Sequence, residues 1–304
     1  MNQKAGEIMS IRIGTSEAGG TFNLQGEAVG DLLRDDMDVE VLPVEGSSVA
    51  NANRLHLGQL EFGFSASNWV GRAMRGEDPF EEKIDIRMVG PANVGPMFFI
   101  ARADSGLRTI DNMRGKRVSV NIRESGMYQH VRTIFGILGI SFDEFEPVHM
   151  SFEEGGVALE KGEIDAQWQC PIPNPVMTDI ANRMDVRVLE YGPGQLENVI
   201  SEAGYYRAAK MEKDAFRGID TDTRQVGVLN VITTHARVDD ALVQEVVSRM
   251  IANTDRLADA VPLYKGLAGL YAELKTEGAS VFEPDGVPLH PGALAAYREA
   301  GLLS

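Results

Sequence analysis

The chain has 304 residues, of which 43% are hydrophobic and 24% charged, a balance typical of a globular protein with one large or two smaller cores. Its formal net charge of −16 disfavours nucleic acid and anionic membrane surfaces as partners, but a local field can still hold a small anion. One cysteine excludes an internal disulfide, and no apolar run reaches the roughly 18 residues that a membrane span needs.

The amino-terminal residues, MNQKAGEIMS, lack the apolar core of an export signal. Two expectations follow, a cytoplasmic protein or one whose export signal has been removed. The residue pattern alone leaves both open.

Short β-branched runs alternate with helical patterns along the chain, which predicts an α/β fold. Helices are predicted where Leu24, Ala28 and Leu32 recur at helical spacing, and over 238–257 as one amphipathic helix. Further helix starts are predicted at Thr109, at the Ser151–Glu154 capping box and at His290. The predicted strands are 11–13, 39–41, 62–64, 86–89, 97–101, 117–120, 165–169, 186–189 and 228–233.

Two strand–loop–helix units, at 11–33 and 116–138, could each begin a separate sheet. The apolar segments 97–102 and 228–234 then fit strands that cross between two lobes. We therefore predict a discontinuous first lobe, 8–103 plus 228–304, and an inserted second lobe, 104–227.

The first candidate site is the loop GTSEAGGT, residues 14–21, between a strand and a helix. Backbone amides at a helix start, with the hydroxyls of Thr15, Ser16 and Thr21, suit a carboxylate or phosphate. The glycine spacing matches neither the dinucleotide fingerprint nor a Walker A motif. The alternative is a tight turn that needs glycine dihedral angles.

Two more polar segments follow strands in the first lobe. Ser47 and Ser48 precede a helix, and they suit either a ligand or a plain helix cap. Ser67, Asn68 and Trp69 lie at a strand's carboxyl end, where open α/β sheets bind ligands. Trp69 suits the core as well as a ligand platform.

The inserted lobe offers a second set of candidates. Arg123 presents a guanidinium for a carboxylate, unless Glu124 or another acid pairs with it. Trp168 ends a strand before a proline-rich loop, residues 171–175. Tyr205 lies near the predicted return crossing, where packing at a hinge is the alternative role.

Enzyme motifs are weaker than these binding motifs. A G-x-S-x-G elbow is nearly matched at 63–67, but Ser67 stands where glycine is required. Cys170 has no histidine near it in sequence. The histidines form no H-E-x-x-H motif and are dispersed at His56, His130, His149, His235 and His290.

In their order along the chain, these segments resemble the TAXI family of solute receptors for tripartite ATP-independent periplasmic (TRAP) transporters. The resemblance covers nearly the whole chain, and the ordered set is more specific than any one segment. The segments that carry it are IRIGTSEAGGTFNLQGEAVGDLL, VEGSSVANANRLHLGQLEFGFSASN, IDNMRGKRVSVNIRESGM, LEKGEIDAQWQCPIPNPVMTDIA and LHPGALAAYREAGL.

The resemblance implies a type II periplasmic-binding-protein fold, with two α/β lobes joined by crossing hinge strands. It also implies a monomeric periplasmic receptor, with its export signal removed, that captures a small anionic carboxylate solute between the lobes. Glutamate-like and dicarboxylate solutes such as 2-oxoglutarate belong to the family, and the permease of a TRAP transporter is the implied partner. We expect no cofactor, no metal and no catalysis. The alternatives are an enzyme acting on a small carboxylic acid, and a regulator's effector domain, which the lack of a helix-turn-helix segment disfavours.

The residues that match the family's contact positions, together with the neighbouring side chains, form the predicted site. Departures from the family's usual pattern at Ser16–Ala18, Arg123–Glu124, Met127 and Pro171 fall within this site, so the resemblance does not carry the solute's identity. The predicted solute contacts are Thr15, Ser16, Gly20, Thr21, Phe22, Ser47, Ser48, Ser67, Asn68, Trp69, Arg123, Ser125, Gly126, Met127, Trp168, Pro173 and Tyr205.

Overall fold

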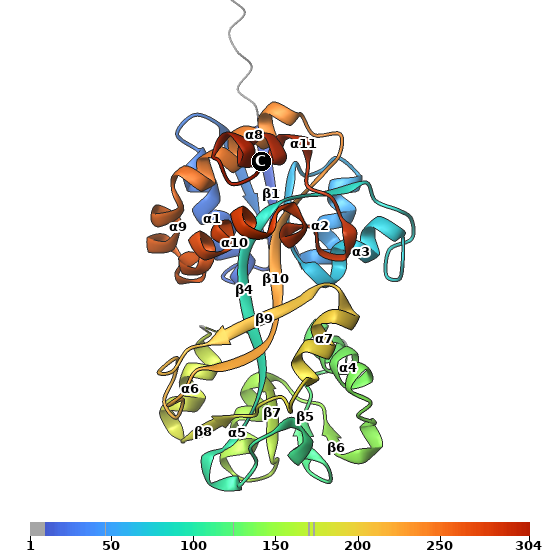
Figure 1. Cartoon of the computed structure of the whole chain (residues 1–304), viewed down its shortest axis with the longest axis vertical. Coiled ribbons are helices and arrows are strands. Elements are labelled where there is room, and N and C mark those ends of the chain that lie inside the picture. The colour runs from blue at the N-terminus through green and yellow to red at the C-terminus, as the bar shows by residue number, and fades with distance from the viewer. Residues whose placement is uncertain (1–9, 46, 124, 170, 173) are drawn as a thin grey trace, which may run out of the picture. The chain divides into compact units, whose positions relative to one another are not determined.

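The computed structural model describes residues 10–45, 47–123, 125–169, 171–172 and 174–304. The chain divides into two compact units (Figure 1). Unit 1 contains the residues up to Val94 and Leu229–Ser304, and unit 2 is Gly95–Val228. The chain passes between them within two long strands, β4 (Ile86–Arg102) and β10 (Thr223–His235).

Unit 1 is built on a mostly parallel sheet with strand order β2-β1-β3-β10. The strand β1 (Ser10–Gly14) lies parallel to both β2 (Asp38–Leu42) and β3 (Phe62–Ala66). β10 lies antiparallel to β3, with Asn230 opposite Ala66. The carboxyl ends of β1, β2 and β3 therefore share one edge of the sheet.

The helices of unit 1 form two packed groups (Figure 1). In one group α1, α8, α9, α10 and α11 contact one another, and in the other α2 contacts α3. The helices are α1 (Thr21–Leu33), α2 (Ser47–His56), α3 (Ser67–Arg75), α8 (Asp240–Ala252), α9 (Thr254–Ala260), α10 (Leu267–Glu277) and α11 (Pro291–Glu299), with 3-10 turns η4 (Pro262–Gly266), η5 (Ala279–Phe282) and η6 (Pro284–Gly286).

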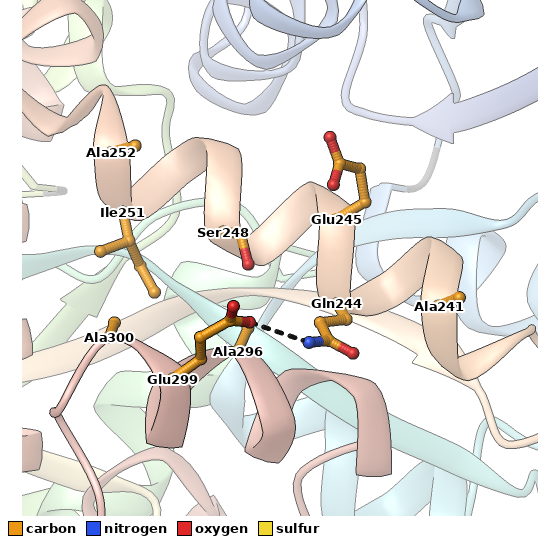
Figure 2. A pocket seen from close by; sticks show the side chains of 9 residues that line it. All are labelled: Ala241, Gln244, Glu245, Ser248, Ile251, Ala252, Ala296, Glu299 and Ala300. Carbon is orange, nitrogen blue, oxygen red and sulfur yellow. Dashed lines mark hydrogen bonds between the residues drawn. The ribbon is translucent and has the colours of Figure 1, made fainter.

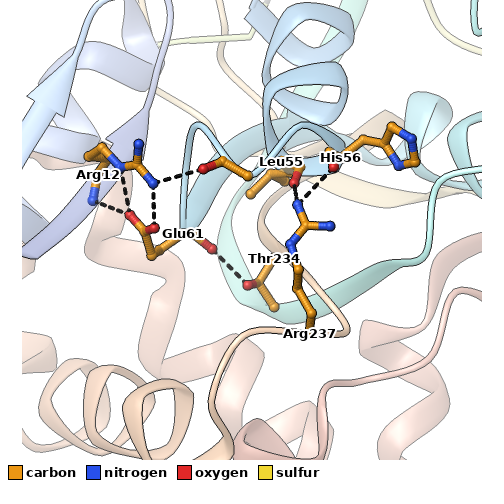
Figure 3. Close-up of polar contacts among 7 residues, drawn as sticks. Arg12, Leu55, His56, Glu61, Thr234 and Arg237 are labelled. Carbon is orange, nitrogen blue, oxygen red and sulfur yellow. Dashed lines mark hydrogen bonds and ion pairs between the residues drawn. The ribbon is translucent and has the colours of Figure 1, made fainter. Parts of the chain in front are cut away.

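Two arginines fix the connection between α2 and β3 (Figure 3). Arg12 on β1 donates to the Glu61 carboxylate at 2.7 Å and to the Gly58 carbonyl at 2.9 Å. Arg237, which follows β10, donates to the carbonyls of Leu55 and His56, the latter at 2.8 Å. The Leu55 carbonyl also accepts the backbone N–H of Gly58 at 3.1 Å, so this N–H and the guanidinium together cap the end of α2.

Unit 2 contains a smaller mixed sheet. Its strand β5 lies parallel to both β6 and β7. Strand β4 pairs antiparallel with β7 and with β8. Strand β9 pairs antiparallel with β10. Helix α4 packs against α7, and α5 packs against α6. The elements are β5 (Arg117–Ser119), β6 (Glu146–Val148), β7 (Ala166–Gln169), β8 (Val186–Val188), β9 (Tyr206–Met211), α4 (Gly126–Leu138), α5 (Phe152–Glu160), α6 (Pro175–Arg183), α7 (Gln195–Ala203), η1 (Ala103–Ser105), η2 (Ile110–Met113) and η3 (Phe142–Glu144).

The predicted helix starts agree with the structure. The Ser151–Glu154 capping box is formed, and Thr109 caps η2 in the same way with Asn112. The ring of His290 accepts the Gly292 amide at 3.2 Å at the start of α11. These local signals suffice because a cap is decided by residues within one turn.

Three predicted elements, two strands and one helix, are wrong in their bounds. The segments 86–89 and 97–101 are one strand, β4. Gly90 lies within this strand, where a Cβ would collide with the Tyr297 hydroxyl. The helix predicted over 238–257 is two helices, since the Asn253 side chain donates to the Arg249 carbonyl at 2.9 Å and Asn253 leaves helical geometry (φ −121°, ψ 29°).

Three further differences concern burial, strands and boundaries. Leu24, predicted on the apolar face of α1, is 50% exposed. The strands β6 and β9 were not predicted, because their residues lack a β-branched run. The chain passes from unit 1 to unit 2 at Val94/Gly95, inside β4, and returns at Val228/Leu229, inside β10, where the predicted lobe bounds were 103/104 and 227/228.

The contact between α8 and α11 supplies a test of the packing in unit 1 (Figure 2). A Cβ at Gly292 would collide with the Asp240 carbonyl and lie 3.0 Å from the Gln244 backbone nitrogen. Because backbone cannot move aside as a side chain can, we expect Gly292→Ala to lower the free energy of unfolding by about 1–3 kcal/mol.

Urea denaturation measures this change, and Gly269→Ala is the matched control. Gly269 is an exposed residue of α10, and no atom of the described residues lies within 4 Å of the position that its Cβ would take, so alanine there should stabilise the protein by about 0.5–1 kcal/mol. Equal effects of the two substitutions would contradict the close approach at Gly292.

Candidate functional site

Three polar helix starts gather at the carboxyl edge of the sheet in unit 1. Helix α1 begins at Thr21 after β1, α2 begins at Ser47 after β2, and α3 begins at Ser67 directly after β3. Because these strands are parallel, the three starts lie at the same edge. The structure thus brings together all the predicted site residues of the first lobe.

The loop before α1 is shaped by its own side chains. Ser16 Oγ accepts a hydrogen bond from the backbone N–H of Asn23 at 3.2 Å, and this bond caps α1 from outside the helix. Thr15 Oγ1 donates to the Leu42 carbonyl at 3.1 Å. A Cβ at Gly20 would lie 2.5 Å from Ser16 Oγ, so this glycine permits the close approach. Thr15 and Ser16 are buried and serve the loop itself.

The first amides of α1 are not used by this loop. Within the described part of the chain, the backbone N–H groups of Thr21 and Phe22 make no hydrogen bond. Thr21 is exposed, whereas the Phe22 ring is buried against Phe64 with centroids 5.7 Å apart. Two free donors at the positive end of a helix can hold an anionic oxygen.

Asn51 of α2 ties two strand ends together. Its side-chain amide donates to the Thr15 carbonyl at 3.0 Å and to the Phe64 carbonyl at 2.8 Å. Ser48 Oγ accepts the Ala66 amide at 3.0 Å, so a second side chain of α2 holds the end of β3. Ser47 opens the helix with a positive φ of 42°.

The start of α3 contributes a buried amide side chain. Asn68 is 8% exposed, and its Oδ1 has no hydrogen-bond partner in the described residues. Ser67 is fully buried. Trp69 is half-buried against the apolar core, and the Arg72 guanidinium lies 5.3 Å from its ring centroid. Trp69 therefore serves as packing in this structure.

Sequence reasoning missed a buried polar cluster at the same edge, formed by Gln25, Asn93 and Asn230. Gln25 Nε2 and Asn230 Nδ2 both donate to Asn93 Oδ1, each at 3.2 Å. All three side chains are at least nine-tenths buried. The sequence does hold one signal of this cluster, because each of the two long apolar strands, β4 and β10, contains a single asparagine.

In unit 2, Arg123 and the start of α4 follow β5. Ser125 caps α4, because its Oγ accepts the Tyr128 amide at 3.1 Å. Gly126 is exposed and Met127 half-buried. Arg123 is exposed, and it makes no ion pair or hydrogen bond with any residue that the structure describes. Its guanidinium is thus available to an anion.

The remaining candidates of unit 2 are packed. Trp168 is 1% exposed, and its ring lies 4.6 Å from that of Phe99. Tyr205 packs edge-on against Tyr206 with centroids 4.7 Å apart. The predicted contact Pro173 lies outside the described residues, as do Gly46, Glu124 and Cys170.

His130 is a buried histidine on α4. Its Nδ1 lies 2.7 Å from the Tyr206 hydroxyl. Burial penalises the charged ring and lowers the pKa of His130 to about 4, so the ring is neutral at pH 7.

Three surface cavities, of about 580, 300 and 380 Å³, lie away from all these residues. The largest is formed by α8 and α11 (Figure 2). In the described part of the chain, no group of three or more His, Cys, Asp or Glu side chains is arranged to hold a metal ion. No described helix combines the length and apolarity of a membrane span.

A model of the NMT1-like family matches residues 13–301, which includes both units and every strand end described above. The chain belongs to the NMT1-like family. This assignment is coarser than the TAXI resemblance, and it leaves the kind of transporter open.

Solved structures show which fold this NMT1-like protein shares. The periplasmic aliphatic sulphonate binding protein SsuA from Escherichia coli is 14% identical, with a TM-score of 0.52, covering 95% of this chain and 82% of that chain. A TctC solute binding protein from Polaromonas is 14% identical, with a TM-score of 0.56, covering 83% and 87%. XAC2383 from Xanthomonas citri, bound to ATP, is 13% identical, with a TM-score of 0.51, covering 96% of each. The fold is the two-lobed α/β fold of periplasmic binding proteins.

The Asn51 amide gives a test of how the site is held. Replacing Asn51 by alanine removes two buried hydrogen bonds, to the Thr15 and Phe64 carbonyls, so we expect the free energy of unfolding to fall by about 2–4 kcal/mol. Asn53→Ala, on the exposed side of the same helix, should change it by less than about 0.5 kcal/mol. Similar urea midpoints for both variants would show that Asn51 does not hold the strand ends.

His130 gives a test by pH. An unfolded histidine has a pKa of about 6.5, above the value of about 4 in the folded chain. The unfolded state therefore binds the proton more tightly, and the stability from neutral His130 is complete above pH 6.5 and lost as the pH falls toward 4.

Between pH 7 and 4.5, wild type should lose about 2–3 kcal/mol more unfolding free energy than His130→Gln. Denaturant titrations of both proteins at the two pH values measure this difference. An equal loss of unfolding free energy in wild type and His130→Gln would show that His130 does not titrate in this way.

Proposed function

We propose that this NMT1-like protein is a periplasmic receptor that binds a small carboxylate solute and passes it to the permease of a TRAP transporter. Membership of the family and the fold of periplasmic binding proteins support the receptor role. The choice of an anion rests on the start of α1, where the backbone N–H groups of Thr21 and Phe22 have no hydrogen-bond partner among the described residues.

A carboxylate fits these amides better than a neutral group does. Charge-assisted hydrogen bonds contribute about 1.5–3 kcal/mol each, and the helix dipole adds up to about 2 kcal/mol when the site is partly buried. A few such contacts suffice for a micromolar dissociation constant, which corresponds to about −8 kcal/mol. The global charge of −16 does not oppose this, because screening limits its reach to about 10 Å at moderate salt.

Arg123 is proposed as a second contact for the solute's carboxylate. It is the cation that follows β5, and no acid among the described residues competes for it. A guanidinium binds a carboxylate through two parallel hydrogen bonds, which adds geometric selection to the attraction of charge. Ser125 and Gly126 follow at the start of α4 and would present further amides.

The TRAP permease is the proposed partner because of the resemblance to the TAXI family. A further structural neighbour, SsuA from Methylobacillus flagellatus KT, is named as the sulfonate-binding protein of a sulfonate ABC transporter, so the shared fold does not choose between transporter types. Reconstituted uptake with each type of permease, driven either by ATP or by an ion gradient, would distinguish them.

Calorimetry with small carboxylic acids and their methyl esters tests the proposal. An acid that binds should lose at least tenfold in affinity as its ester, because the ester has no charge for the α1 amides. The same samples are assayed for product, and turnover would favour an enzyme on this fold. Equal affinity of acids and esters would refute an anion-binding receptor.

Arg123→Ala should weaken binding of the same acid by at least about fivefold, equivalent to about 1 kcal/mol, with no change in thermal stability. Arg132→Ala is the matched control, since Arg132 is an exposed arginine of α4 beyond its first turn. An unchanged dissociation constant in Arg123→Ala would remove this residue from the site.

A further inference from the structure

The cluster of Gln25, Asn93 and Asn230 has more hydrogen-bonding capacity than its neighbours use. Asn93 Oδ1 accepts two hydrogen bonds, which fills both of its lone pairs. Its Nδ2 group, with two hydrogens to donate, has no partner among the described residues, and neither has the acceptor Gln25 Oε1. A buried polar group without a partner destabilises the fold, so two of them in one cluster need an explanation.

The cluster lies at the same edge as the free amides of α1. Gln25 is one turn along α1 from Thr21. Asn230 stands opposite Ala66, the residue directly before α3. Asn93 is joined to both side chains, so the cluster lies between the starts of α1 and α3. A solute held by the first amides of α1 would reach it with its next polar group.

No charged side chain among the described residues hydrogen-bonds to the side chains of this cluster. Besides the two hydrogen bonds within the cluster, the Tyr264 hydroxyl donates to the Gln25 backbone carbonyl at 3.2 Å. A second carboxylate would meet no cation here, and an ammonium group would meet no carboxylate. Burying either charge without a partner costs more than burying a neutral polar group.

We propose that Gln25, Asn93 and Asn230 form a subsite for an uncharged polar group of the solute, a hydroxyl or a carboxamide. Such a group accepts from Asn93 Nδ2 and donates to Gln25 Oε1, so it meets both unused groups at once. The inference rests on the proposed function, in which the solute's carboxylate lies at the start of α1. It narrows the solute class to hydroxy acids and amide-bearing monocarboxylic acids.

A series of acids on one carbon skeleton tests the subsite in the wild-type protein. The series is butyrate, 4-hydroxybutyrate, succinamate, succinate and 4-aminobutyrate, with the corresponding five- and six-carbon acids, measured by calorimetry. At one chain length or more, we expect the hydroxy and amide acids to bind at least tenfold more tightly than the unsubstituted, dicarboxylic and amino acids. Equal or tighter binding of the dicarboxylic or amino acid at every length would overturn the subsite and leave the carboxylate receptor intact. If no acid in the series binds more tightly than its methyl ester, the proposed function and this inference both fail.

Asn93→Asp supplies a second, independent readout. Its carboxylate keeps an acceptor for Gln25 and Asn230 and replaces the unused NH2 group by a negative charge. We expect the preference to shift at least tenfold toward the amino acid of the series. Asn53→Asp makes the same charge change on the exposed face of α2 and should leave the order of affinities unchanged. The same order in Asn93→Asp as in wild type would show that the cluster serves folding alone.

Discussion

One carboxamide holds the carboxyl edge of unit 1 in place. Asn51 donates to a carbonyl at the end of β1 and to another near the end of β3, and it is fully buried. The loop before α1 starts at Thr15, and α3 starts three residues after Phe64. The positions of both helix starts, and of the amides they present, therefore depend on this interaction between two parallel strands.

The site proposed in unit 1 relies on neutral donors rather than on cations. Several arginines of the unit are paired with acids, as in Arg12–Glu61, Arg75–Asp285 and Arg249–Asp36. What remains at the edge is backbone N–H groups and carboxamides. Such donors select by geometry and by hydrogen-bonding pattern, whereas a lone cation accepts any anion of suitable size.

The sequence predicts the local parts of this fold well. A strand followed by a glycine-rich helix start places Thr21 correctly, and the capping boxes at Thr109 and Ser151 are visible from four residues. The cluster of Gln25, Asn93 and Asn230 could not be predicted, because its members are far apart along the chain and meet only when α1, β4 and β10 pack together. Helix breaks such as Asn253 depend on one side-chain hydrogen bond, which a periodic pattern does not reveal.

The late position of β10 in the chain has a consequence for biosynthesis. β10 covers the side of β3 that faces away from β1, yet it ends at residue 235, after the whole of unit 2. On the ribosome, this side of β3 therefore has no partner strand until residues 230–233 have been made. Uncovered edges invite pairing with other chains, so the nascent protein depends on rapid synthesis of the inserted unit, or on a chaperone, at this stage.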